Sequence, residues 1–421
     1  MLLAIPVFHF LFLLIYIIRK NGFDISAGMA TLYLITSLAG LILGNLDMDF
    51  NYENYSRIEI ELLPIIVYCL CITICIYPFI LYNSNKKREL LQIKNIDFFS
   101  KIVYFYFFVF IFLIVLFFDQ LIFMFLYGDL GELRTMAYAG ELSTVIDSLS
   151  GFPRRIAGIM TIFGDGANMM IPFFFYSFTR LNKSVKFNFL ILISSLSPVL
   201  LGIVNVDRSK TTFWILLFFM SFLFFKQYIV TKKQKRIIKI FCLVFGGALL
   251  LYLAAVTISR WDDTDQGVLY NVLCYLGQPV INFCNIWSNL PDNQFYIHRI
   301  FPFYSLIGDE YDKFNEFIIN GYLKNGVHLN VFFSFVGMFL VDMGHYAAVI
   351  ISIIIALLEL SVLRKTRLKR SVSMKDVVIV FALGSIVQCG IITYFYGSIP
   401  RILAVFIFLI LSKYLKKRSI N

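Results

Sequence analysis

Long apolar runs separated by clusters of charge are the feature of this 421-residue sequence that most constrains its fold. A helix needs roughly 20 apolar residues to cross a hydrocarbon core of about 30 Å, where no water can satisfy a broken backbone. The alternating pattern of a membrane β-barrel is missing. With a mean hydropathy of +0.80 and only 15% charged residues, the chain is too apolar for a soluble globular domain. We therefore expect an all-α polytopic membrane protein with about eleven transmembrane helices.

The expected spans divide the chain into three parts. They lie at residues 2–18, 27–45, 62–82, 102–127, 156–178, 187–206, 211–225, 237–257, 331–363, 376–396 and 402–415. Residues 1–257 hold the first eight helices, residues 258–330 form one large loop, and residues 331–421 hold the rest. The run at 331–363 is too long for one perpendicular helix and carries Asp342, Gly344 and His345 midway. A broken or re-entrant segment is therefore expected to precede that crossing.

The basic residues predict the orientation of the chain in the membrane. Alternate connections hold most of the 37 lysines and arginines, as cytoplasmic loops do. The amino terminus and the loop at 258–330 are therefore expected outside the cell, and the carboxyl terminus inside. This placement accounts for most of the net charge of +11, so the expected partner of the basic residues is the lipid bilayer and not nucleic acid.

The loop at 258–330 is too long to be a plain connection, and we expect it to form a small external subdomain of short helices and turns. Its aromatic side chains suit either anchoring at the membrane interface or stacking on sugars. They belong to Trp261, Tyr270, Tyr275, Trp287, Tyr296 and Tyr304.

Basic residues at the outer boundary, against the general bias, are candidates for a binding site, because something must compensate the cost of holding them there. They are Arg208 and Lys210 in a very short outer turn, Arg260 at the end of the eighth span and Arg299 in the large loop. A guanidinium offers a planar fork of donors that matches phosphate oxygens, which favours a lipid-linked phosphate or pyrophosphate. The alternative is that each arginine pairs with a local carboxylate, as Asp207 could pair with Arg208, and extends to the interface.

Three side chains before the return into the membrane are candidate catalytic bases. His328 precedes the ninth span, where an imidazole could take a proton or hydrogen-bond a sugar hydroxyl. Glu310 and Glu316 could serve instead, although the segment GDEYDKFNE is also typical of a solvated loop. A lone histidine is more often structural, so the identity of the base stays open.

Polar residues inside the spans form another set of candidates. Asp165 and Asn168 lie in the fifth span with a glycine on each side of Asp165, so the helix there is expected to be broken or closely packed. Asp119 and Glu359 are placed similarly but nearer the ends of their spans. An ion or proton pathway is one possible use of these groups. The sequence contains no histidine or cysteine spacing typical of a metal site and no Walker lysine loop, so no metal or other cofactor is expected.

The span layout and three motifs together carry a family resemblance. The motifs are DRSKTTFWILLFF around the outer turn, YLGQPVINF early in the large loop, and NGYLKNGVHLNVFFSFVGMFLVDMG at the return into the membrane. In these features the chain resembles, over nearly its whole length, the bacterial O-antigen polymerases, which are the Wzy-type oligosaccharide repeat-unit polymerases. The layout carries more of this resemblance than any single residue.

The resemblance implies a GT-C-like fold in the bacterial inner membrane with an active site facing the periplasm. It implies a metal-independent, inverting glycosyltransferase that transfers a growing glycan from undecaprenyl pyrophosphate onto the next lipid-linked repeat unit, making O antigen or capsule. By resemblance, Arg208 and Arg260 would hold the pyrophosphate, and His328 falls near the polar residue before the return helix. A chain-length regulator and a flippase are further implied partners.

Two other functions share part of this pattern. A transporter or flippase of lipid-linked oligosaccharides would share the spans and the arginines, but it would favour two similar halves and helices broken at the midplane. A membrane-bound acyltransferase would need a histidine deep in the membrane beside a substrate tunnel. His9 is well inside the first span, but its neighbours offer it no partner.

Overall fold

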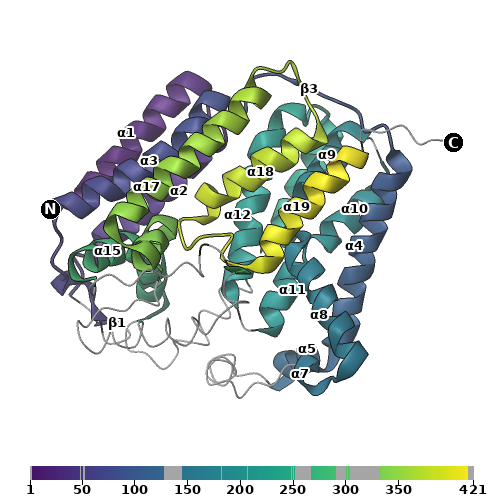
Figure 1. Ribbon diagram of the computed structural model, residues 1–421, viewed down its shortest axis with the longest axis horizontal. Coiled ribbons are helices and arrows are strands. Elements are labelled where there is room, and N and C mark those ends of the chain that lie inside the picture. Colours follow the sequence, from purple (N-terminus) through teal and green to yellow (C-terminus); the bar gives the residue numbers. More distant parts are fainter. Residues whose placement is uncertain are drawn as a thin grey trace. The chain divides into compact units, whose positions relative to one another are not determined.

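The described residues fold mainly into helices and form two compact units. Unit 1 comprises Met1–Lys87, Leu269–Arg370 and Ala382–Ile399, and unit 2 comprises Arg88–Val268, Ser371–Phe381 and Pro400–Asn421. In this computed structural model (Figure 1) the described residues are 2–47, 49–50, 53–127, 145–181, 183–205, 207–247, 249, 251, 267–290, 300, 302–303 and 332–415.

Eight helical segments of the described part of the chain are long and apolar enough to cross a membrane. They are Ala4–Asn21, Ile25–Leu43, Leu62–Tyr82, Ile96–Leu116, Gly151–Leu181, Val185–Val204, Arg208–Tyr228 and Ser334–Arg367. These segments coincide with the first seven and the ninth of the expected spans, so the protein is an all-α polytopic membrane protein. The expected spans at 376–396 and 402–415 contain helices of 16 residues each, and the span at 237–257 lies partly outside the described residues. The count of eleven therefore stays a prediction.

Unit 1 is built on α1 (Ala4–Asn21), α2 (Ile25–Leu43), α3 (Leu62–Tyr82) and α17 (Ser334–Arg367). These helices pack side by side, with α17 along α3 and α1 along α2 (Figure 1). The turn between α1 and α2 is fixed by Asp24, whose carboxylate accepts hydrogen bonds from the Ala27 amide (3.0 Å) and the Ser26 hydroxyl (2.6 Å), a standard helix cap. Between α2 and α3 lie the short antiparallel strands β1 (Asp49–Phe50) and β2 (Glu53–Asn54) and the 3₁₀ turn η1 (Tyr55–Arg57).

One helix of unit 1, α15 (Gly267–Asn289), falls inside the loop that was expected to contain only short helices, and that expectation is wrong here because α15 has 23 residues. A Cβ atom at Gly277 would lie 2.6 Å from the Ala39 carbonyl carbon, so glycine lets α15 approach the α2 backbone closely. The polar side chain of Asn282 is buried and donates to the Phe332 carbonyl at 3.1 Å. Close backbone contact and satisfied polar groups thus make this segment a core helix.

The break expected in the ninth span is confirmed. Helix α17 is interrupted at Gly344, where φ is 82° and ψ is 178°, a combination that glycine adopts most easily. Next to the break, the His345 ring lies 4.6 Å from the Trp287 ring and its Nε2 is 2.7 Å from the Trp287 carbonyl oxygen. The break therefore places the His345 side chain in contact with α15. Trp287 and the buried Tyr270 are packing residues in the structure.

Unit 2 contains most of the remaining helices. They are α4 (Ile96–Leu116), α5 (Phe118–Tyr127), α7 (Val145–Ser148), α8 (Gly151–Asp165), α9 (Met170–Tyr176), α10 (Val185–Ser194), α11 (Ser197–Val204), α12 (Arg208–Phe225), α13 (Lys232–Phe241) and α19 (Ile399–Tyr414). The 3₁₀ turns η2 (Gly166–Met169) and η4 (Lys226–Tyr228) and the π-helical turns η3 (Ser177–Leu181) and η5 (Cys242–Gly246) interrupt or extend them. Helix α18 (Met374–Cys389) has residues in both units.

The helices of unit 2 are joined through an aromatic core and one short strand pair. Phe173 of α9 stacks on Phe99 of α4 at 5.6 Å and meets Phe408 of α19 edge-on at 5.1 Å. Strand β3 (Glu89–Leu90) pairs in parallel with β4 (Ser371–Val372). These contacts bring α19, at the end of the chain, beside α4 and α9.

Candidate functional site

The structure describes two of the seven site residues expected from the sequence. Arg208 and Lys210 both lie in the first turn of α12. Arg260, Arg299, Glu310, Glu316 and His328 lie outside the described residues, so their roles stay predictions.

The turn between α11 and α12 sets the position of these two basic residues. The Asp207 amide donates to the Gly202 carbonyl at 2.7 Å, which closes the turn tightly. A Cβ at Gly202 would lie 2.7 Å from the Asp207 carbonyl oxygen and 3.1 Å from the Lys210 Cβ, so the turn requires glycine. The Asp207 carboxylate accepts from the Ser209 amide at 2.9 Å and caps α12. The tight turn and the cap thus fix where α12 begins and place Arg208 and Lys210 in its first turn.

Lys210 meets the carboxylate of Asp165, which ends α8. The ammonium nitrogen lies 3.1 Å from Oδ1 of Asp165, and the two side chains are 16% and 7% exposed. The helix is broken at this point, as expected, because α8 gives way to the 3₁₀ turn η2. A Cβ at Gly166 would lie 2.7 Å from the Ala404 Cβ, so this glycine also permits close packing on α19. The break and the close contact together hold Asp165 against α12 and α19.

The other side of the Asp165 carboxylate faces an arginine that sequence analysis did not select. Nε of Arg401, in the first turn of α19, lies 3.6 Å from Oδ2 of Asp165, and its side chain is 11% exposed. The Arg401 guanidinium also lies 4.9 Å from the centre of the buried Phe213 ring on α12, within range of a cation–π interaction. We call Asp165, Lys210 and Arg401, together with Arg208 in the same helix turn as Lys210, the charged cluster of unit 2.

The position of the cations in this cluster opposes the usual helix electrostatics. The first turn of a helix carries a partial positive charge and favours acidic side chains. The acidic N-cap Asp207 supplies negative charge at the start of α12, but the first turns of α12 and α19 contain no acidic residue and hold Arg208, Lys210 and Arg401. The two nearly buried cations share one carboxylate, and two helix N-termini add to their field. The charged cluster is therefore a candidate site for an anion, which helix N-termini and basic side chains both attract.

Two further acidic residues are buried in unit 1. Asp342 lies just before the break in α17, and Glu359 lies deeper in the same helix, both with fully buried side chains. Among the described residues, the carboxylate oxygens of Glu359 have no hydrogen-bond partner. No group of three or more histidine, cysteine or acidic side chains placed to hold a metal ion occurs in the described part of the chain.

The geometry explains why Arg401 was missed and how it could have been found. It lies at the start of the last expected span, in GSIPRIL, and the expected orientation places it at the same kind of boundary as Arg208. The sequence search followed arginines in turns and in the large loop, and so passed over this one. Applying the same criterion to both ends of every span would have selected it.

No family model, curated protein or solved structure matches this chain. The class of protein therefore follows from the structure: an all-α polytopic membrane protein with a charged cluster, rich in cations, among the helices of one unit.

Proposed function

We propose that this protein is a membrane glycosyltransferase that polymerises oligosaccharide repeat units linked to undecaprenyl pyrophosphate. The observation that carries the proposal is the charged cluster of unit 2, in which Lys210 and Arg401 are nearly buried around the single carboxylate of Asp165. A pyrophosphate carries several charged oxygens, and arginine and lysine near it supply charge-assisted hydrogen bonds. The apolar helices around the cluster suit the lipid part of such a donor.

The proposed reaction is one displacement at the anomeric carbon of the donor glycan. A hydroxyl of the acceptor repeat unit attacks that carbon, the bond to the pyrophosphate oxygen breaks, and the configuration inverts. The pyrophosphate lipid leaves with the bonding electron pair, and cations in fixed positions stabilise its growing charge more than they stabilise the ground state. The proton of the hydroxyl passes to a base, for which His328, Glu310 and Glu316 are the candidates.

The remaining parts of the proposal follow the predicted orientation. The cluster, together with Arg260 and Arg299, would face the outer side of the bacterial cytoplasmic membrane. Lipid-linked repeat units are present on that side after translocation. A flippase would deliver those units and a length regulator could limit the product. The step requires no metal, because the cations of the chain neutralise the leaving group.

A transporter of lipid-linked oligosaccharides is the second candidate. Helices broken inside the membrane are typical of transporters, and in the described part of the chain α17 is interrupted at Gly344 and α8 gives way to a 3₁₀ turn at Gly166–Met169. Such a protein would also use the charged cluster to hold a pyrophosphate, but it would release the substrate unchanged on the other side.

The test is the formation of product by the purified full-length chain in detergent, given lipid-pyrophosphate-linked repeat units. A polymerase makes a ladder of longer lipid-linked glycans and releases undecaprenyl pyrophosphate. A transporter forms no such products, because it only moves its substrate across a membrane and detergent leaves no membrane compartments.

A second test uses cells that lack the gene. In those cells, Arg208→Ala and Arg401→Ala at matched abundance should leave single repeat units on the surface. Lys186→Ala, an exposed cation of α10 in the same unit, should restore long chains. Normal chain lengths in the deletion strain would rule out polymerisation.

A further inference from the structure

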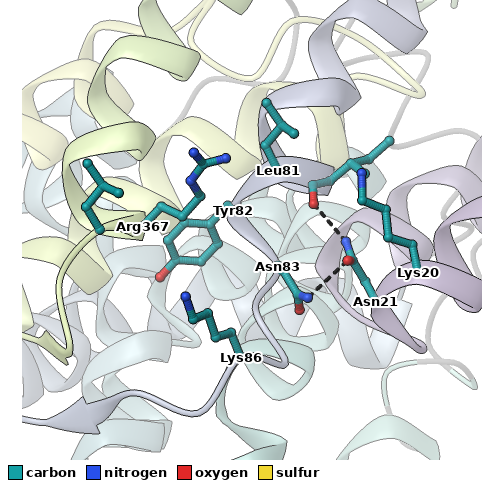
Figure 2. Close-up of a pocket in the computed structure, with 9 residues that line it drawn as sticks. Lys20, Asn21, Leu81, Tyr82, Asn83, Lys86 and Arg367 are labelled. Atoms are coloured by element: carbon teal, nitrogen blue, oxygen red, sulfur yellow. Dashed lines mark hydrogen bonds between the residues drawn. The ribbon is translucent and has the colours of Figure 1, made fainter.

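A pocket in unit 1 gathers basic side chains at the ends of three helices. It has a volume of about 440 Å³ and lies where α1, α3 and α17 end (Figure 2). Its lining consists of Lys20, Asn21, Ile80, Leu81, Tyr82, Asn83, Lys86, Arg367 and Leu368. The lining thus contains three cations and no acidic side chain. The pocket belongs to a different unit from the charged cluster and is independent of the function proposed above.

An asparagine network holds the wall of the pocket in shape. Asn21 donates from its side-chain amide to the Ile80 carbonyl at 2.8 Å and accepts from the Asn83 amide at 3.0 Å, as the dashed lines in Figure 2 show. Asn85 donates to the Asn21 carbonyl at 2.7 Å. Asn83 adopts a positive φ of 50°, which asparagine tolerates better than most residues. These bonds join the ends of α1 and α3 and occupy carbonyl groups that would repel an anion.

Two of the three cations have no side-chain partner among the described residues. Lys86 and Arg367 make no side-chain hydrogen bond and no ion pair with that part of the chain, and Figure 2 draws both beside the Tyr82 ring. Lys20 donates to the Tyr16 hydroxyl at 3.0 Å, so it is held by its own helix. The ends of α1 and α17 attract Lys20 and Arg367 through the helix dipole, but Lys86 follows α3 in the chain and belongs to no helix. The dipole therefore does not explain why three cations line one pocket.

The helices that end at the pocket carry exposed apolar side chains along their length. On α1, Phe12 and Tyr16 are 67% and 49% exposed, and on α17, Leu357 and Leu358 are 59% and 58% exposed. Leu368, in the lining itself, is 70% exposed. In a membrane protein such faces contact acyl chains. A ligand with a phosphate for the cations and acyl chains for the adjoining helix faces would fit both parts.

We propose that this pocket binds the phosphate of an anionic phospholipid at the membrane face that the basic residues predict to be cytoplasmic. Lys86 and Arg367 contact the phosphate oxygens, Lys20 adds charge at the rim, and the Asn21 network keeps the wall fixed. Basic pockets between membrane helices on that side are suited to lipid headgroups, which basic residues attract electrostatically. A free phosphate would satisfy the cations but would leave the apolar faces without a role.

The experiment measures lipid bound to the full-length protein in detergent by native mass spectrometry, with phosphatidylglycerol or phosphatidylcholine added. Wild-type protein should retain phosphatidylglycerol in preference. The double variant Lys86→Gln/Arg367→Gln should bind it about tenfold more weakly, because two cations near the phosphate are lost. The matched control Lys87→Gln/Arg364→Gln removes the same charge from exposed neighbours that do not line the pocket, and it should retain the lipid.

Three outcomes would overturn the proposal. The first is equal retention of phosphatidylglycerol and phosphatidylcholine by the wild-type protein. The second is equal loss of lipid in the two double variants, which would indicate a general effect of charge. The third concerns the source of the phosphate: if inorganic phosphate raises the thermal midpoint of the protein as much as phosphatidylglycerol does, through Lys86 and Arg367, the ligand is a soluble phosphate and not a lipid.

Discussion

Lys210 on α12 and Asp165 at the end of α8 form an ion pair at 3.1 Å between side chains that are both largely buried. The pair joins two helices that each begin or end at a glycine-dependent turn, and its carboxylate also faces Arg401 at 3.6 Å. One carboxylate thus lies between a lysine and an arginine that both belong to the first turns of helices. The stability of the protein and its proposed binding of an anion therefore depend on the same few residues. Variants of these residues can separate the two effects.

Replacing Asp165 alone should destabilise the protein more than replacing Asp165 and Lys210 together. Asp165→Asn removes the negative charge beside the largely buried Lys210 and Arg401 side chains, and the loss of one partner of a buried pair costs about 3 kcal/mol. In Asp165→Asn/Lys210→Met the charge of the group returns to its wild-type value. We expect the thermal midpoint in detergent to fall in the single variant and to recover largely in the double variant. Equal midpoints for the single variant and the wild type would contradict this account of Asp165.

Changing Arg401 tests the proposed donor site by its geometry. Arg401→Lys keeps the charge but loses the planar fork of donors and most of the stacking on Phe213. If the cluster binds pyrophosphate, chain elongation by purified protein should be reduced but present in Arg401→Lys and lost in Arg401→Ala. Phe213→Leu weakens the support of the guanidinium by about 1 kcal/mol and should give an intermediate loss. Full activity in Arg401→Ala would place the donor elsewhere.

A methyl group at Gly166 should disturb the cluster without changing any charge. Its Cβ would lie 2.7 Å from that of Ala404, so η2 and α19 must separate by a fraction of an ångström, at a cost of about 1–3 kcal/mol. The matched control is Gly158→Ala in α8, where nothing lies within 4 Å and alanine favours the helix. We expect Gly166→Ala to lower both the thermal midpoint and elongation, and Gly158→Ala to raise the midpoint slightly. The reverse order would show that the close packing on α19 is dispensable.

The break in α17 should resist substitution. Gly344 has φ of 82° and ψ of 178°, where any residue with a Cβ is strained by about 1–3 kcal/mol. Gly344→Ala should therefore lower the thermal midpoint and loosen the contact between His345 and Trp287. Tryptophan fluorescence of a variant that retains Trp287 as its one tryptophan would report that change. An unchanged spectrum and midpoint would mean that the helix bends without glycine.

Replacing Glu359 with an apolar residue should stabilise unit 1. Its carboxyl is fully buried and has no hydrogen-bond partner among the described residues, and such a group costs free energy that methionine, of similar volume, does not. Glu359→Met should raise the thermal midpoint by an amount equivalent to about 2 kcal/mol. Leu357→Met, at an exposed position on the same helix, is the control and should change nothing. A lower midpoint in Glu359→Met would reveal a partner for the carboxyl.

The sequence predicted the features that depend on local composition. Hydropathy located the eight membrane-length helices of the described residues, and polar residues beside glycine located the interruptions at Gly344 and after Asp165. It did not predict the contact of Asp165 with Arg401, because those residues are far apart in the chain and only the folded helices bring them together. It was wrong about α15, because the loop at 258–330 was expected to contain only short helices and turns, whereas α15 has 23 residues and Gly277 fits against the backbone of α2. Such contacts depend on the complementary shapes of two helices, and the sequence of one helix does not predict the shape of its partner.

The position of Lys210 and Arg401 in the first turns of two helices beside Asp165 favours the binding of an anion. A ligand that binds the folded protein and not the unfolded chain stabilises the fold, so occupancy of this cluster and resistance to heat are thermodynamically linked. A preparation stripped of its lipid ligands should lose activity sooner during storage than one kept with an anionic ligand at saturating concentration. The lifetime of the protein in detergent then becomes a screen for its natural substrate, without any assay of sugar transfer.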